Sequence, residues 1–238
     1  MSQKITNESI LMAGFPSAGL VGAFAVSYLV RYLNMERVGE LDFPKISPTF
    51  VIEKGQVFGP SQVYKKENVY AVINWLPLDL LSAHDFTNTS IEFCKQHKID
   101  KIIIPRGMEI VGGKDAKSQS FGIAVNENSK QLLTKYSITS IPNASIFGAD
   151  AGVIASLRKS DIPGLILYTI CRQQFPDPQA TVMSINTLSS ILGVSIDTAA
   201  VEKKLEELGR DYMHHIEKAK NTMQQREKTA SMMPPGIA

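Results

Sequence analysis

Apolar residues occur along the first part of the chain in short runs divided by turn-forming residues. The run Ile10–Ala13 ends at Gly14, and after a turn-rich stretch an almost wholly apolar segment follows at 21–33. This order predicts a strand, a glycine loop and a buried helix. Further apolar runs predict consecutive strands, some of them antiparallel, at 50–52, 62–64 and 69–73.

The middle of the chain exchanges strand and helix patterns regularly. A loosely helical stretch at 79–97 precedes the apolar run Ile102–Ile104. Later apolar runs at 145–147 and 164–171 predict strands, and the helix patterns lie at 129–136, 150–157 and 180–192. Gly193 suits the left-handed position that follows a helix end. This rhythm predicts an α/β fold with a mixed, largely parallel sheet that helices cover on both faces.

Beyond residue 195 the composition changes to charged helix formers. A stripe of residues recurs there at alternating spacings of four and three: Val201, Leu205, Leu208, Tyr212, His215 and Ala219. Such a stripe packs either on its own α/β domain or on helices of neighbouring subunits, and the heptad-like spacing favours the second. We therefore expect an α/β core over 1–195, a C-terminal helical extension over 196–230 and a flexible tail over 231–238.

Composition and charge exclude several classes of protein. The 238 residues suffice for one large core, and 25 basic residues are interspersed with 23 acidic ones, so a nucleic-acid partner is not expected. Cys94 and Cys171 lie in apolar stretches that suit buried thiols, which agrees with a reducing cytoplasm. The first ten residues are polar and no apolar run reaches roughly 18 residues, so neither secretion nor a membrane partner is expected.

The glycine loop at 14–22, with the sequence GFPSAGLVG, follows a strand and opens a helix, where backbone N–H groups can bind an anion. The Walker pattern fails because Leu20 and Val21 stand where Lys and Ser or Thr are required, and the dinucleotide fingerprint is not matched. The nucleophile-elbow pattern also fails, since a glycine is missing two residues before the serine. We favour a structural turn over a small-ligand site formed by Gly14, Phe15, Pro16, Ser17, Gly19 and Gly22.

A second glycine-rich loop is predicted at 106–115, after the strand at 102–104. It lies at a carboxyl end of the sheet, where open α/β sheets bind ligands. The Walker lysine position is occupied by a glycine, and the lysine is displaced by one residue. A simple connecting loop is favoured over a contact for an anion or a protein partner that would use Arg106, Gly107, Glu109, Gly112, Gly113 and Lys114.

Two histidine-containing sets could carry chemistry. His84 and Asp85 adjoin on a predicted helix and point in different directions, so a surface or capping role is favoured over an acid–base pair. Cys94 and His97 have the spacing of half a zinc site, but no second pair completes the tetrahedron. We therefore expect no catalytic residue, no metal and no cofactor.

Three blocks of sequence resemble the proteasome assembly chaperone 2 family. They keep their order and cover most of the chain from residue 10 to about 197: 14–22 with Ala25 and 28–30; 146–154; and 176–181 with Leu188, 192–193 and 196–197. The chain resembles an archaeal-type homologue of this family. The resemblance implies a three-layer α/β/α sandwich similar to phosphorylase and hydrolase-like folds. It also implies homo-oligomers with a non-enzymatic role in proteasome assembly or proteasome binding. Prokaryotic members often carry enzyme labels such as ATP-grasp, which the missing phosphate-binding lysine does not support.

The last residues depart from one feature of the family. Some archaeal relatives end in a hydrophobic-Tyr-any motif that docks on the proteasome α-ring, whereas this chain ends in Pro-Gly-Ile-Ala, so docking by a C-terminal tyrosine is not expected. The leading hypothesis is a homo-oligomeric scaffold or chaperone whose partners are itself and proteasome subunits. The alternative is a small-molecule enzyme of the nucleoside phosphorylase or hydrolase type, with its site at the two glycine-rich loops.

Overall fold

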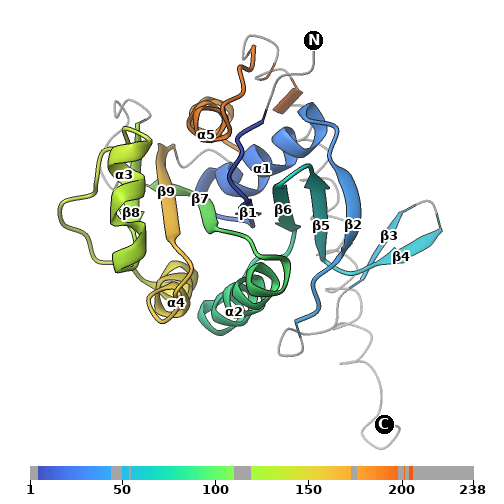
Figure 1. Ribbon diagram of the computed structural model, residues 1–238. Helices are drawn as coiled ribbons and strands as arrows, with labels where there is room; N and C mark the ends of the chain where they lie inside the picture. Colours follow the sequence, from blue (N-terminus) through green and yellow to red (C-terminus); the bar gives the residue numbers. More distant parts are fainter. Residues whose placement is uncertain are drawn as a thin grey trace, which may run out of the picture. The chain divides into compact units, whose positions relative to one another are not determined.

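The computed structural model describes residues 5–43, 50–53, 55–109, 119–172, 176–197, 201, 204 and 205. The chain forms two compact units, Met1–Thr198 and Ala199–Ala238. The first unit contains a seven-stranded sheet in the order β2-β5-β6-β1-β7-β9-β8 and a separate two-stranded ribbon of β3 and β4 (Figure 1).

The strands are short and mostly aliphatic. Their bounds are β1 Ile10–Gly14, β2 Glu36–Glu40, β3 Val51–Glu53, β4 Gln56–Phe58, β5 Ser61–Lys66, β6 Val69–Asn74, β7 Lys101–Glu109, β8 Ser120–Ala124 and β9 Gly164–Cys171. The four central strands β6, β1, β7 and β9 run parallel to one another, while β5 pairs antiparallel with β6, β2 with β5 and β8 with β9. The sheet is therefore mixed and largely parallel, as the alternating pattern predicts.

Helices cover both faces of this sheet. Their bounds are α1 Val21–Tyr32, α2 Leu80–His97, α3 Lys130–Lys135, α4 Gly148–Leu157 and α5 Pro178–Leu192, with 3₁₀ turns at Ala18–Leu20 and Glu127–Ser129. Figure 1 shows α1 and α5 on one side of the sheet and α2 and α4 on the other. This arrangement is the three-layer sandwich that the resemblance implies.

Helix ends follow local capping rules. Asp79 accepts a hydrogen bond from the backbone N–H of Ser82 and so caps α2. The carboxylate of Asp177 caps α5 in the same way, and Pro178 occupies the first turn, where its missing N–H is not needed. Gly193 follows α5 with φ of 70°, so the predicted helix end is confirmed.

Several elements differ from the sequence prediction. The segment 145–147 is not a strand but leads into α4, and its Phe147 is 81% exposed. The strands β2 and β8 were not expected, because β2 is polar and exposed along its whole length and β8 is only partly buried. The strand β7 continues to Glu109 rather than ending at Ile104, because β9 pairs with it over its whole second half despite Pro105.

The C-terminal extension is described at only a few positions. Val201 and Leu205 are helical and buried. The other members of the heptad-like stripe and the tail lie outside the described residues, at Leu208, Tyr212, His215, Ala219 and 231–238. The oligomer helix therefore stays a prediction. In the part of the chain that the structure describes, none of the helices combines the length and the apolar character needed to cross a bilayer.

Candidate functional site

The two predicted loops leave the sheet from neighbouring strands. β1 and β7 are parallel and adjacent, and the chain after β1 leads towards the β2 edge while the chain after β7 leads to the opposite edge at β8. Open α/β sheets bind ligands at the carboxyl ends of strands where such connections diverge. Of the second loop, Arg106, Gly107 and Glu109 lie in β7 itself, while Gly112, Gly113 and Lys114 lie outside the described residues.

The first loop lies directly against β7, and two glycines permit this contact. A Cβ atom at Gly22 would lie 2.1 Å from the carbonyl oxygen of Pro105, and one at Gly107 would lie 1.9 Å from the carbonyl oxygen of Ala18. Gly19 has φ of 60°, a left-handed conformation that glycine adopts without strain. Close contact between two backbone segments therefore explains these glycines without a bound phosphate.

Arg106 joins three elements beneath the first loop. Its side chain is 6% exposed, and its Nε donates a hydrogen bond to Oδ1 of Asp150 at 2.8 Å. Its Nη1 donates to the carbonyl oxygens of Phe15 at 3.3 Å and Pro16 at 3.1 Å, and the guanidinium carbon lies 4.0 Å from the centre of the Phe15 ring. The guanidinium thus holds β7, the first loop and the first turn of α4 together.

Tyr168 lies beside this ion pair. It pairs in register with Arg106 across the β7–β9 ladder and is almost completely buried. Burial raises the pKa of Tyr168 above its ordinary value, and the negative charge of Asp150 raises it further. The phenol therefore remains protonated at neutral pH and cannot act as a base there.

Ser17 is held by the strand beneath it. Its Oγ accepts a hydrogen bond from the backbone N–H of Gly107 at 3.0 Å. A serine nucleophile needs a general base within hydrogen-bond reach of its hydroxyl, whereas the partner described here is a backbone amide. The observed role of the Ser17 side chain is to fasten the first loop to β7.

Asp177 closes the other side of the first loop. Its backbone N–H donates to the carbonyl oxygen of Gly19 at 3.0 Å. Its carboxylate accepts hydrogen bonds from the backbone N–H groups of Arg172 at 2.7 Å and Ala180 at 3.0 Å. This acid therefore orders the start of α5 and the loop beside it.

Both cysteines are buried, as the sequence predicts. Burial raises the pKa of the Cys171 thiol to about 12, with the carboxylates of Asp177 and Glu109 adding to the shift, and burial also raises the pKa of the Cys94 thiol. Neither thiol is a reactive thiolate at neutral pH. Among the residues that the structure describes, no group of three or more His, Cys, Asp or Glu side chains is placed to hold a metal ion.

His84 contributes to packing between helices. Its Nδ1 lies 2.7 Å from Oγ of Ser156 on α4, and the same hydroxyl donates to the carbonyl oxygen of His84 at 3.1 Å. Asp85 is buried, so the expected surface position is wrong for that residue. A Cβ atom at Gly152 would lie 2.3 Å from the carbonyl oxygen of Leu80, so α2 and α4 are also in close backbone contact.

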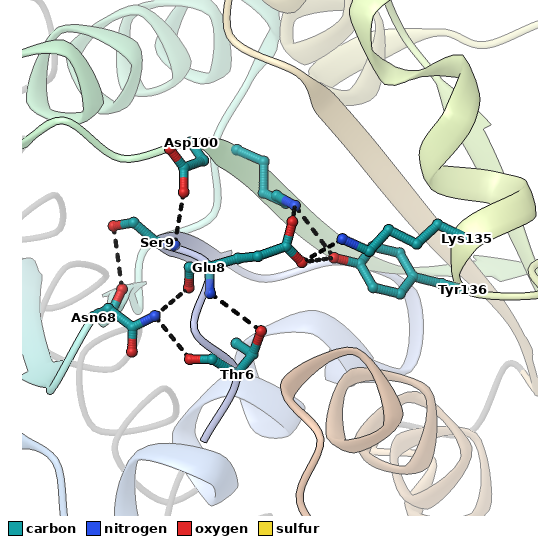
Figure 2. A network of polar contacts seen from close by, with 8 residues as sticks. Thr6, Glu8, Ser9, Asn68, Asp100, Lys135 and Tyr136 are labelled. Carbon is teal, nitrogen blue, oxygen red and sulfur yellow. Dashed lines mark hydrogen bonds and ion pairs between the residues drawn. The ribbon is translucent and has the colours of Figure 1, made fainter. Parts of the chain in front are cut away.

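A polar network at the amino end of the sheet was missed by sequence reasoning (Figure 2). Glu8 forms ion pairs with Lys101 and, at 2.7 Å, with Lys135, and its Oε2 accepts a hydrogen bond from Oη of Tyr136 at 3.0 Å. Burial alone would raise the pKa of Glu8, but the hydrogen bonds from these three side chains outweigh it and lower the pKa to about 2. A signal was available, because residues of opposite charge stand near the starts of two apolar runs, at Glu8 and Lys101.

The same network fastens the segment before β1. The side-chain amide of Asn68 donates to the carbonyl oxygens of Thr6 at 2.8 Å and Glu8 at 2.5 Å, and the backbone N–H of Ser9 donates to Asp100 at 2.8 Å (Figure 2). These contacts tie the first described residues to β6 and β7. Their observed role is structural.

Comparisons with known proteins find relatives that share the fold of this chain and most of its length. A family model described as the PAC2 family matches residues 11–216. An uncharacterised protein of Methanocaldococcus jannaschii is 25% identical in an alignment of 231 positions that covers 89% of this chain and 90% of that protein.

Two solved structures from Pyrococcus furiosus have the same fold. PbaA, described as an archaeal homolog of proteasome-assembly chaperone, gives a TM-score of 0.74 at 22% identity and covers 92% of this chain and 96% of its own. PbaB, described as an archaeal proteasome activator, gives a TM-score of 0.68 at 20% identity and covers 90% of this chain and 94% of its own.

Proposed function

Because the chain belongs to the PAC2 family, we propose that it is a non-enzymatic scaffold or chaperone that binds other proteins in proteasome assembly or proteasome binding. The family membership confirms the resemblance that the three sequence blocks carry. The names of PbaA and PbaB support a proteasome-related partner for a chain of this fold. Fold alone does not assign a function, and the contacts at the candidate site give further support.

The observation that carries the proposal is that the polar groups at the candidate site bind one another. Arg106 donates to Asp150 and to two carbonyl groups of the first loop, and Ser17 accepts from the backbone of β7. An enzyme site requires a nucleophile or base whose functional atom can reach a substrate. The described groups instead fasten the first loop to β7, and this structural role supports a non-enzymatic function.

We further propose that the protein acts as a homo-oligomer in the cytoplasm. The support is the heptad-like stripe in the C-terminal extension, a pattern that buries apolar residues between helices of neighbouring subunits. In this proposal the α/β core supplies the rigid body, and the extension supplies or braces one subunit interface. In this proposal the core spans 1–195, the extension 196–230 and the tail 231–238.

The proposal is tested by capture from native extract. The tagged chain is purified under conditions that retain weak complexes, and the co-purifying proteins are identified by mass spectrometry. We expect proteasome subunits to be enriched over a tag-only control. Repeated capture without any proteasome subunit, from an extract in which those subunits are abundant, would contradict the proposed function.

A further inference from the structure

The carboxylate of Glu8 occupies a cationic site that other elements of the chain form. Lys101 begins β7, Lys135 ends α3 and Tyr136 follows it. Both lysines form ion pairs with the Glu8 carboxylate, and Oη of Tyr136 donates to it at 3.0 Å while accepting from Nζ of Lys101 at 3.3 Å. Figure 2 shows Glu8 pointing toward Lys135 and Tyr136. Three side chains from outside its own segment therefore hold this one carboxylate.

The cationic site needs an anion. Two ammonium groups face the one carboxylate of Glu8, and the side chain of Lys101 is only 5% exposed, against 48% for Lys135. The carboxylate of Asp100, beside Lys101 in the sequence, accepts a hydrogen bond from the backbone N–H of Ser9. A buried charge without a partner is strongly disfavoured. If Glu8 left the site, another anion would therefore be favoured in its place.

Glu8 belongs to a short segment, residues 5–9, which we call the strap. The backbone N–H of Thr6 donates to the carbonyl oxygen of Leu192 at the end of α5 at 2.9 Å, and the side-chain amide of Asn68 donates to the carbonyl oxygens of Thr6 and Glu8. Glu8 is the only charged residue of the strap. A segment of this length has no core of its own, so its attachment depends on these few contacts.

We propose that Lys101, Lys135 and Tyr136 form a binding site for a small oxyanion, a carboxylate or a phosphate, which Glu8 fills from within the chain while the strap is attached. Ammonium groups and a hydroxyl donor are the partners that such oxyanions bind most strongly. The strap is then a conformational device, because Glu8 and an external anion compete for the same site and the anion favours the detached strap.

The tethered carboxylate has an advantage in this competition. A group held by a short segment acts at an effective concentration of the order of millimolar or higher. The parent chain should therefore keep its strap attached when little anion is present. Replacement of Glu8 by an uncharged residue removes the internal competitor and leaves the site open to an added anion.

Hydrogen exchange of the purified full-length Glu8→Ala chain, followed by mass spectrometry, tests the site. In sodium chloride at pH 7 we expect the peptides that cover the strap and 130–136 to exchange at least about tenfold faster than in the parent, with the α2 peptide unchanged. Sodium acetate or sodium phosphate at the same ionic strength should slow exchange at 130–136 in this variant, because the added anion supplies the missing partner of Lys135 and Tyr136.

The two anions also distinguish the classes of ligand. Protection by acetate, by phosphate or by both supports the proposal, and the more effective anion identifies the class that the site prefers. The matched control is Glu92→Ala, which removes the carboxylate of an exposed ion pair with Lys95 and should exchange equally at 130–136 in all three salts. Equal exchange of Glu8→Ala in the three salts would overturn the proposal, as would faster exchange spread evenly over the whole chain.

A second variant locates the bound anion. Lys135 is about half exposed, so Lys135→Gln should leave the fold intact. Added to Glu8→Ala, it should raise the dissociation constant of the anion, titrated by exchange at 130–136, at least about tenfold. An unchanged dissociation constant would mean that the anion binds elsewhere and that the proposal is wrong. If circular dichroism shows Glu8→Ala to be unfolded, Glu8→Gln keeps the size of the side chain and takes its place in the same measurements.

Discussion

Asp150 and Arg106 form a buried ion pair whose loss should be costly. The side chains are 18% and 6% exposed, and Arg106 also bonds the first loop. Removing one partner of a buried pair leaves an uncompensated charge and typically costs about 3–5 kcal/mol. Because Asp150 retains some solvent contact, we expect Asp150→Ala to lower the free energy of unfolding by about 3 kcal/mol, near the lower end of that range. For a chain of this size this corresponds to a melting temperature lower by about 6–12 °C.

Urea unfolding followed by the fluorescence of Trp75 measures this loss. The matched control is Glu92→Ala, which removes an ion pair with Lys95 of similar length, 2.7 Å, whose side chains are 61% and 53% exposed. Exposed pairs contribute about 0–1 kcal/mol, so the control should stay close to the parent. Equal losses in Asp150→Ala and Glu92→Ala would refute the argument that burial makes the Asp150 contact important.

A double-mutant cycle assigns the loss to the pair itself. Arg106→Leu alone removes the donors to the carbonyl groups of Phe15 and Pro16 as well as the partner of Asp150. The combined variant with Asp150→Ala should therefore be less destabilised than the sum of the two, by about 0.5–3 kcal/mol. Additive losses would mean that the two side chains do not interact energetically.

Three further outcomes follow from particular contacts. Gly152→Ala should lower the free energy of unfolding by about 1–3 kcal/mol in the same titration, because its Cβ would meet the backbone oxygen of Leu80, whereas Gly39→Ala has no atom within 4 Å and should have no effect. Because the pKa of Glu8 is lowered in the folded protein, the contribution of its carboxylate to the free energy of unfolding is complete above the unfolded pKa of 4.5 and is lost as the pH falls towards 2. Glu8→Gln should therefore be less stable than the parent at pH 6 and equal to it near pH 2. A constant difference in stability across a pH series of unfolding measurements would contradict this. Iodoacetamide at pH 8 should modify Cys171 slowly in the native chain and rapidly in urea, since burial raises the pKa of that thiol; equal rates by mass spectrometry would show that the thiol is accessible.

The central part of the fold could be predicted from sequence because its strands are buried on both faces. Such strands consist of uninterrupted aliphatic runs, as in 10–13 and 102–104, and a glycine after an apolar helix pattern identified the helix end at Gly193. The edge strand β2 could not be predicted because all of its residues are exposed and no apolar alternation remains. At Phe147 the prediction failed in the opposite direction: the apolar run at 145–147 indicated a buried strand, whereas the side chain of Phe147 is exposed.

The candidate site could be located by sequence but not understood from it. Glycine spacing identified the first loop, yet the reason for Gly22 and Gly107 is a contact between segments roughly 85 residues apart, which only the fold brings together. Arg106 was expected in a loop, where a simple connection was favoured over a contact with an anion or a protein partner. Its position within β7 directs the guanidinium to Asp150 and the first loop instead.

We propose that this PAC2 family member is an oligomer that binds proteasome subunits. Light scattering on the purified chain, with and without residues 202–238 and then after incubation with cognate proteasome α-subunits, tests it most directly. We predict a defined oligomer whose mass falls on truncation, and a heavier complex when α-subunits are added to the full chain. A chain that is monomeric with and without these residues, and whose mass is unchanged by α-subunits, would contradict the proposed function.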